Sequence, residues 1–202
     1  MHYFTFAEKD TTLYQGTGSL NAGLDEVLEV QKLVSDSGDV VNVSRILIKF
    51  DLSYLSGSLV NGTISKSAKY YLNLFDAKSS NLNISQSLYA YPVSQSWDMG
   101  QGNSYDNPIT TVGCSWNFRD NDTTGTLWGE VSSSGGTWIS GSGYEASQSF
   151  NHKTVDIRMD VTDIVRKWMS GSIDNHGFIV KRKGHLGNLD TTSDEGNTSH
   201  FG

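Results

Sequence analysis

The chain is poor in cysteine and in long apolar runs, and each shortage excludes a class of protein. Cys114 is alone among 202 residues, so the chain has no internal disulfide, no Cys-x-x-Cys redox pair and no multi-thiolate zinc site. We expect this thiol to be a small buried apolar group. No apolar run approaches the roughly 20 residues needed to cross a bilayer, and residues 1–12 lack the pattern of a secretion signal. We therefore expect a soluble chain with no membrane partner and no leader.

Positive charge is also scarce. The chain has 15 Lys and Arg residues against 22 Asp and Glu residues, which gives a formal net charge of -7. The longest basic run is the tripeptide 181–183, far short of the positive surface that a phosphate backbone demands. Nucleic acid is therefore not an expected partner.

Proline is rare and glycine is common, with 2 Pro against 21 Gly. Together with abundant Ser, Asn and Thr, this composition is typical of many short strands joined by tight turns. The length suits one sizeable domain. We predict a single all-β domain over residues 1–202.

The clearest strand signal runs over 45–52, where alternate apolar residues share one face: Ile46, Ile48 and Phe50. This is the period of a half-buried strand. Comparable alternation predicts further strands over 26–34, 64–75, 86–93, 154–160 and 177–183. Glycine pairs such as Gly135 and Gly136 supply the turns, so the strands are expected to be antiparallel.

One helix signal interrupts the strands. Asp160 can cap a helix whose apolar residues recur at the spacing of a single stripe: Val161, Ile164, Val165 and Trp168. Gly171 suits a left-handed ending. The pattern predicts one short α-helix at about 160–170, anchored on the sheet by Trp168.

The segment 94–149 loses all periodicity and is rich in Gly, Ser, Asn, Asp and tryptophan. Two short strands, over 126–131 and 137–141, are expected within it. Its tryptophans either close the core or form an exposed platform for sugar rings, and core closure is the favoured interpretation for any one of them. The candidate sugar platform consists of Trp116, Trp128 and Trp138.

No catalytic residue is predicted, and the chain is not expected to be an enzyme. The acidic residues of the long segment are typical turn formers or solvated groups: Asp98, Asp106, Asp120, Asp122, Glu130 and Glu145. The five histidines lack paired metal-ligand spacing, and there is no Gly-x-Ser-x-Gly elbow or phosphate-binding loop. No cofactor is expected, although structural calcium at 120–122 is an alternative, because oxygen ligands suit that ion.

Six ordered segments resemble the DNRLRE-type β-sandwich modules, which are also grouped with alginate-binding carbohydrate-binding modules. The matching segments are Asp10-Thr-Thr-Leu, Ser44-Arg-Ile-Leu-Ile-Lys-Phe-Asp-Leu, Tyr91-Pro-Val-Ser-Gln-Ser-Trp-Asp98, Gly135-Gly-Thr-Trp138, Asp160-Val-Thr-Asp-Ile-Val-Arg-Lys-Trp168 and Asn175-His-Gly-Phe-Ile-Val-Lys181. The resemblance implies a jelly-roll-like antiparallel β-sandwich without catalysis. Such modules occur in extracellular polysaccharide-related or adhesive proteins and in structural proteins of tailed bacteriophages.

One departure from the family concerns the end of the chain. Family members continue past the position of Lys181 into one more strand, whereas this chain ends in a polar tail over 188–202. We predict that this tail forms no strand of the domain's own and that the sheet keeps an open edge.

These observations predict a structural or adhesive module, a bacteriophage virion component of the capsid, neck or tail. Its partners would be other virion proteins or copies of itself. The alternative is an extracellular carbohydrate-binding module that binds polysaccharide through the loop aromatics.

Overall fold

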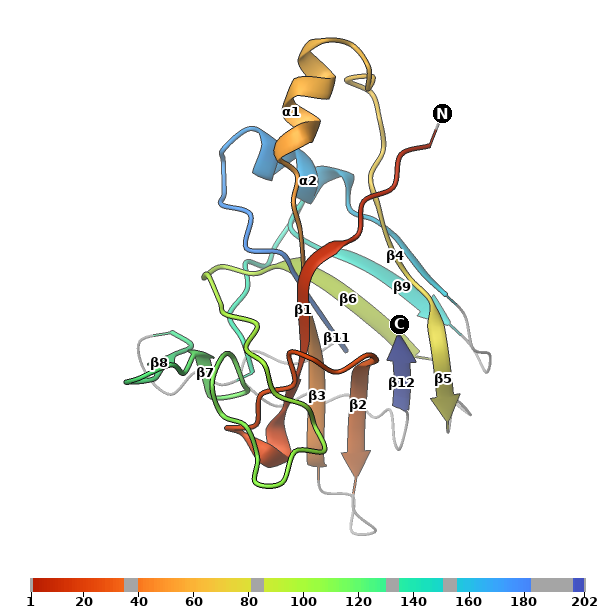
Figure 1. The fold of residues 1–202 in the computed structure, drawn as a ribbon. Coiled ribbons are helices and arrows are strands. Elements are labelled where there is room, and N and C mark those ends of the chain that lie inside the picture. Colours follow the sequence, from red (N-terminus) through yellow and green to blue (C-terminus); the bar gives the residue numbers. More distant parts are fainter. Residues whose placement is uncertain are drawn as a thin grey trace.

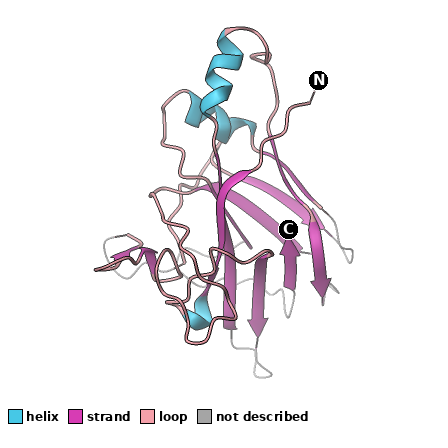
Figure 2. Cartoon of the chain, in the orientation of Figure 1, coloured by secondary structure: helices cyan, strands magenta, loops and turns pink. Residues whose placement is uncertain are grey.

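The computed structural model describes residues 2–34, 40–80, 86–129, 135–150, 156–182 and 198–201. These residues are mostly strands, with two short α-helices and one 3-10 turn (Figure 2). The strands are β1 (Ala7–Tyr14), β2 (Leu28–Val34), β3 (Val40–Phe50), β4 (Tyr71–Leu74), β5 (Asp76–Ser80), β6 (Gln86–Pro92), β7 (Phe118–Asp120), β8 (Thr126–Leu127), β9 (Ala146–Phe150), β10 (Ile157–Asp160), β11 (Phe178–Arg182) and β12 (Thr198–Phe201). The helices are α1 (Ser53–Val60) and α2 (Thr162–Met169), and the 3-10 turn is η1 (Gln15–Thr17).

One large antiparallel sheet dominates the fold (Figure 1). Its strand order is β5-β12-β2-β3-β11-β6-β9, with β1 also paired to β3. The pair β4–β10 forms a second antiparallel sheet, and β7–β8 forms a small hairpin-like pair. The prediction of an all-β fold built from antiparallel sheets is confirmed.

Strand β3 lies at the centre of the large sheet, between β1 and β11. Ile46 and Ile48 point to one face, as the alternation predicts, and both are buried. The opposite face is buried as well, since Arg45 and Leu47 are both 0% exposed. The interpretation of this strand as half-buried was therefore wrong, because a second layer covers the face that carries Arg45.

The first core lies between the large sheet and the layer formed by β4, β10 and α2. Trp168 of α2 packs edge-on against Phe178 of β11, with 4.6 Å between the ring centroids. The buried residues of this core include Leu28, Val30, Ile46, Ile48, Leu72, Leu74, Leu88, Ile157, Met159, Ile164, Val165 and Val180. This burial explains why α2 needs an apolar stripe on one side only.

Helix α2 matches its prediction closely. Asp160 Oδ1 accepts a hydrogen bond from the backbone N–H of Thr162 at 3.0 Å, and Gly171 adopts a φ of 72° after the last turn. Helix α1 was not predicted, because its residues carry no single apolar stripe. Both helices have eight residues, and neither helix in the described part is long and apolar enough to span a membrane.

The bounds of several strands differ from the predictions. The predicted strand over 64–75 begins only at Tyr71, and β5 follows it after Phe75. Of the strand expected over 126–131, β8 covers the first two residues, and residues 130 and 131 lie outside the described residues. The strand expected over 137–141 is reduced to a single bridge between Val93 and Trp138. Local side-chain and turn hydrogen bonds replace strand ladders in this part of the chain.

The end of the chain contradicts the prediction that it forms no strand. Strand β12 lies inside the large sheet, paired to β2 on one side and to β5 on the other. The path of the described sheet ends at β5 and β9, and β1 is also paired on one side only. The prediction that the tail adds no strand and so leaves the sheet open was therefore wrong. Four residues in a polar run are too few for a periodic signal, and here the pairing is made by the backbone. Residues 183–197, which precede β12, lie outside the described residues.

The edge strand β9 is tied to the second sheet by one side chain. Gln148 Nε2 donates to the carbonyl of Asp156 at 3.0 Å, and Gln148 Oε1 accepts from the backbone N–H of Arg158 at 2.7 Å. The amide thereby takes the place of a strand ladder between β9 and β10.

We predict that Gln148→Ala lowers the free energy of unfolding by about 1–2 kcal/mol, because two backbone groups lose their partner at a partly solvated edge. Urea unfolding followed by circular dichroism measures this loss. Ser147→Ala, an exposed substitution on the same strand, is the control and should change stability by less than about 0.5 kcal/mol. Equal stability of the two variants would contradict a structural role for the amide.

Candidate binding surfaces

The described residues of the long segment ahead of β9, 94–129 and 135–145, cover the second face of the large sheet and complete a separate core. That core contains Leu13, Val43, Leu47, Tyr91, Val93, Trp97, Cys114, Trp116, Trp128 and Ile179. Two of its buried tryptophans also have partners for their polar atoms: Trp128 Nε1 donates to the Ser115 carbonyl at 2.9 Å, and Trp97 Nε1 donates to the His176 carbonyl at 2.8 Å. Core closure, the favoured interpretation, is confirmed for these rings.

The sugar platform built from three tryptophans is contradicted for two of them. Trp116 is 3% exposed and Trp128 is 0% exposed, so neither ring face is open to a ligand. Trp138 is half-buried and packs against Tyr91, with 6.2 Å between the ring centroids. Burial of large apolar area in the core outweighs display at the surface for this group.

A buried arginine organises the aromatic side chains of this face. The Arg45 guanidinium lies 4.6 Å from the ring centroid of Trp116 and 5.3 Å from that of Trp138. Its Nη1 donates to the carbonyl of Gly135 at 2.7 Å. Gly135 has a φ of 77°, and a Cβ there would lie 2.6 Å from Nη1, so this position requires glycine. The contact ties the loop to the centre of β3.

Asn21 ties a second part of the long segment to the start of the chain. Its side chain is fully buried, and Nδ2 donates to the carbonyls of Met99 and Cys114, both at 2.7 Å. Oδ1 accepts from the backbone N–H groups of Gly102 at 2.7 Å and Gly23 at 3.3 Å. All four hydrogen-bonding positions of the amide are used. The segment over 99–113 is therefore held by a buried network.

This held segment displays apolar side chains to solvent. Tyr105 is 80% exposed, Ile109 is 50% exposed and Val112 is 47% exposed. Between them, Asp106 Oδ2 accepts hydrogen bonds from Thr110 Oγ1 at 2.6 Å and from the Asn103 N–H at 3.0 Å. These bonds, led by that from Thr110, lower the pKa of the Asp106 carboxyl. We call residues 99–113 the display loop.

Neither Asn21 nor Tyr105 was predicted from the sequence as a functional candidate. The only sequence signal for the close packing around Asn21 is the set of glycines that surround it. A Cβ at Gly23, Gly100 or Gly113 would lie under 3.0 Å from neighbouring backbone atoms. These glycines are distant in the sequence, so the contact cannot be inferred from spacing. Tyr105 carries no pattern that distinguishes it from the core aromatics.

The acidic residues of the long segment do not form a metal-ligand group. Among the described residues, no three His, Cys, Asp or Glu side chains gather where they could hold a metal ion. Asp98 and Asp122 are exposed, and Glu130 lies outside the described residues. Calcium at 120–122 stays an untested alternative. Cys114 is buried, and this burial raises the pKa of its thiol, in agreement with the apolar role expected of it.

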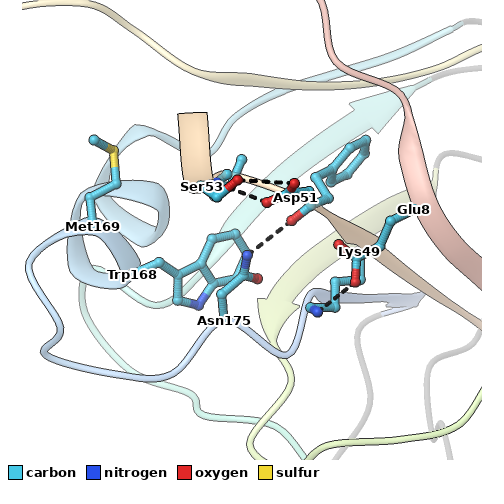
Figure 3. A pocket seen from close by; sticks show the side chains of 9 residues that line it. Glu8, Lys49, Asp51, Ser53, Trp168, Met169 and Asn175 are labelled. Atoms are coloured by element: carbon cyan, nitrogen blue, oxygen red, sulfur yellow. Dashed lines mark hydrogen bonds and ion pairs between the residues drawn. The ribbon is translucent and has the colours of Figure 1, made fainter. Parts of the chain in front are cut away.

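A hollow of about 280 Å³ lies where β3 meets both helices (Figure 3). Its lining residues are Glu8, Lys49, Phe50, Asp51, Leu52, Ser53, Trp168, Met169 and Asn175. Lys49 Nζ pairs with Glu8 Oε1 at 2.6 Å, and the Asp51 carboxylate accepts bonds from the backbone N–H and Oγ of Ser53. We call this the Trp168 hollow.

Comparison with known proteins adds no family assignment: no protein-family model and no curated protein matches this chain. The resemblance to the DNRLRE-type modules therefore stays a prediction.

We predict that Asn21→Ala lowers the free energy of unfolding by about 2–4 kcal/mol, since it strands several buried backbone groups. Urea unfolding measures the loss. The same substitution should increase labelling of Cys114 by a thiol reagent in the native state, because the Asn21 amide no longer holds the Cys114 carbonyl. Asn73→Ala, at an exposed position, is the matched control. Unchanged labelling in both variants would show that Asn21 does not hold this segment closed.

We also predict that Arg45→Lys is not conservative and lowers the free energy of unfolding by about 1–3 kcal/mol. Lysine keeps the charge but loses the planar group that lies against Trp116 and Trp138. Near-ultraviolet circular dichroism should show the altered tryptophan packing. Lys49→Arg, on the same strand at a half-buried position, serves as the control. An unchanged tryptophan spectrum in Arg45→Lys would refute the organising role.

Proposed function

We propose that this chain is a non-enzymatic structural or adhesive module and a component of a bacteriophage virion, in its capsid, neck or tail. The observation that carries the proposal is the display loop, which holds exposed apolar side chains on a hydrogen-bonded frame. A contact surface fixed in advance loses little conformational entropy when it binds.

The frame of the display loop extends beyond Asn21. The backbone N–H of Asn21 donates to the Thr110 carbonyl at 2.8 Å, and that of Leu24 donates to the Gly102 carbonyl at 2.9 Å. Leu24 is itself 50% exposed, so it adds to the apolar surface beside the loop. Apolar side chains that gather on a held surface mark a site of contact with other macromolecules.

The virion setting is supported by the family resemblance and by the architecture it implies. Antiparallel sandwiches with held loops offer surfaces whose geometry repeats identically in every copy. In a symmetric assembly, many such weak contacts combine through avidity. The partners in this proposal are other virion proteins or further copies of the chain.

The alternative function, polysaccharide binding, now depends on fewer aromatic residues. With Trp116 and Trp128 in the core, the half-buried Trp138 and the exposed Tyr105 are the rings of the long segment that this alternative assigns to a sugar. A sugar ring stacks on an open aromatic face and bonds neighbouring polar groups.

We predict that the chain is a component of purified phage particles. We also predict that Tyr105 is protected from oxidation in those particles. Hydroxyl-radical footprinting of the isolated chain and of purified particles measures this protection. Tyr105 should be oxidised less in particles because a partner covers the display loop. Absence of the chain from particles would refute the virion proposal, and an equally reactive Tyr105 would refute the assignment of the loop as the contact.

A glycan array tests the alternative with the same purified chain. The virion proposal expects no polysaccharide binding. Binding that is lost in Trp138→Ala or Tyr105→Ala, with the circular dichroism spectrum unchanged, would contradict it and favour a carbohydrate-binding module.

A further inference from the structure

Two segments far apart in the sequence form one surface at the display loop. Residues 24–27 lie beside the loop, because Asp25 Oδ1 accepts a hydrogen bond from the backbone N–H of Ser104 at 2.9 Å. Figure 1 shows this segment, which leads into β2, close to the loop. It adds Val27, which is 39% exposed, to the open apolar side chains. We call residues 24–27 and 99–113 together the display surface.

The charges of the display surface all have one sign. Its ionisable side chains are three carboxylates, Asp25, Glu26 and Asp106, and no Lys or Arg occurs anywhere in residues 10–31 or 98–118. In the part of the chain that the structure describes, none of the ion pairs involves any of the three. The display surface therefore combines open apolar area with negative charge that no ion pair of the described residues neutralises.

The negative charge is also felt beneath this surface. Tyr14, at the end of β1, is half-buried, and its pKa is raised first by that burial and then by the charges of Glu29 and Asp25. Asp106 itself stays ionised at neutral pH, since its hydrogen bonds, led by that from Thr110, lower its pKa. The carboxylates thus act as full charges on whatever covers the display surface.

This combination restricts what can bind. Specific interfaces have an apolar, aromatic centre and a polar rim, which Tyr105 and Ile109 on one side and the carboxylates on the other provide. Charges across an interface are complementary, and like charges placed together exclude a partner. A second copy of the chain is disfavoured, since it carries a net charge of -7 and would set its own carboxylates against these.

We propose that the display surface binds a segment of a different protein, one in which Lys or Arg side chains alternate with apolar ones. The cations of that segment face Glu26 and Asp106, and its apolar side chains cover Tyr105 and Ile109. The contact is heterologous, since the display surface meets a surface unlike itself. This inference rests on the proposed function, which makes the display loop the site of contact, and it names the chemistry of the partner.

Capped synthetic hexapeptides are the probes for the purified chain. One alternates lysine with leucine and tryptophan, a second has glutamate in place of each lysine, and a third is hexalysine. Fluorescence anisotropy of the labelled peptides measures binding. We expect the lysine and tryptophan peptide to bind about tenfold or more tightly than either of the others at low salt. Its advantage over the glutamate peptide should shrink between about 10 mM and 1 M salt, because the Debye length falls from roughly 30 Å to 3 Å.

Two variants locate the binding on the display surface. Glu26→Lys should weaken binding of the lysine and tryptophan peptide about threefold to tenfold, and Tyr105→Ser about tenfold, since an interface aromatic contributes strongly. Glu145→Lys, at an exposed carboxylate outside the display surface, is the matched control and should change binding less than about twofold. It alters the net charge as Glu26→Lys does, so it separates a specific site from general attraction of cations to an acidic chain. Circular dichroism verifies that each variant is folded.

Several results would overturn the inference. These are failure of the lysine and tryptophan peptide to bind, equal binding of the glutamate peptide, or unchanged binding in either Glu26→Lys or Tyr105→Ser. Self-association of the parent chain in analytical ultracentrifugation that Tyr105→Ser abolishes would assign the surface to a second copy instead. Because no particle is involved, failure here is distinguishable from failure of the virion proposal, which depends on the presence of the chain in particles.

Discussion

The fold depends on a central strand that is buried on both faces. In β3, Ile46 and Ile48 require one apolar cover, and Leu47 with Arg45 requires another. A strand with one face open to solvent would need only one of these two covering layers. The first cover is regular, formed by β4, β10 and α2, whereas the second is irregular and is formed by the described residues of the long segment ahead of β9, 94–129 and 135–145. The rest of the architecture follows from supplying these two covers on opposite sides of one sheet.

The two covers differ in how far the sequence predicts them. The regular cover has periodic signals, so α2 is found within about two residues of its bounds, although the strand predicted over 64–75 starts seven residues ahead of β4. The irregular cover has none: its structure comes from polar side chains that bond distant backbone groups, as Asn21 does with Met99 and Cys114. Strand β12 escaped prediction for a related reason, because backbone pairing in a short polar run needs no hydrophobic alternation.

The candidate surfaces follow the same division. Composition predicts that the tryptophans of the long segment matter, but it cannot distinguish a ring that closes a core from one that faces solvent. Trp128 and Tyr105 both lie in segments rich in polar residues, yet one is 0% and the other 80% exposed. The difference depends on which other segments of the folded chain pack against each ring. The display loop and the Trp168 hollow are consequently properties of the folded chain and not of any local motif.

The hydrogen bonds of Asn21 have a consequence for folding during translation. They join residues 78, 81 and 93 positions apart in the chain. While the chain emerges from the ribosome, the Leu47 face of the sheet has no cover until Cys114 has been made. Contacts of such long sequence separation form slowly, and exposed apolar surface favours aggregation in the interval. The opposite face waits longer still, since β10 and α2 follow Cys114 in the chain, so nascent chains of this protein expose apolar surface until translation is nearly complete.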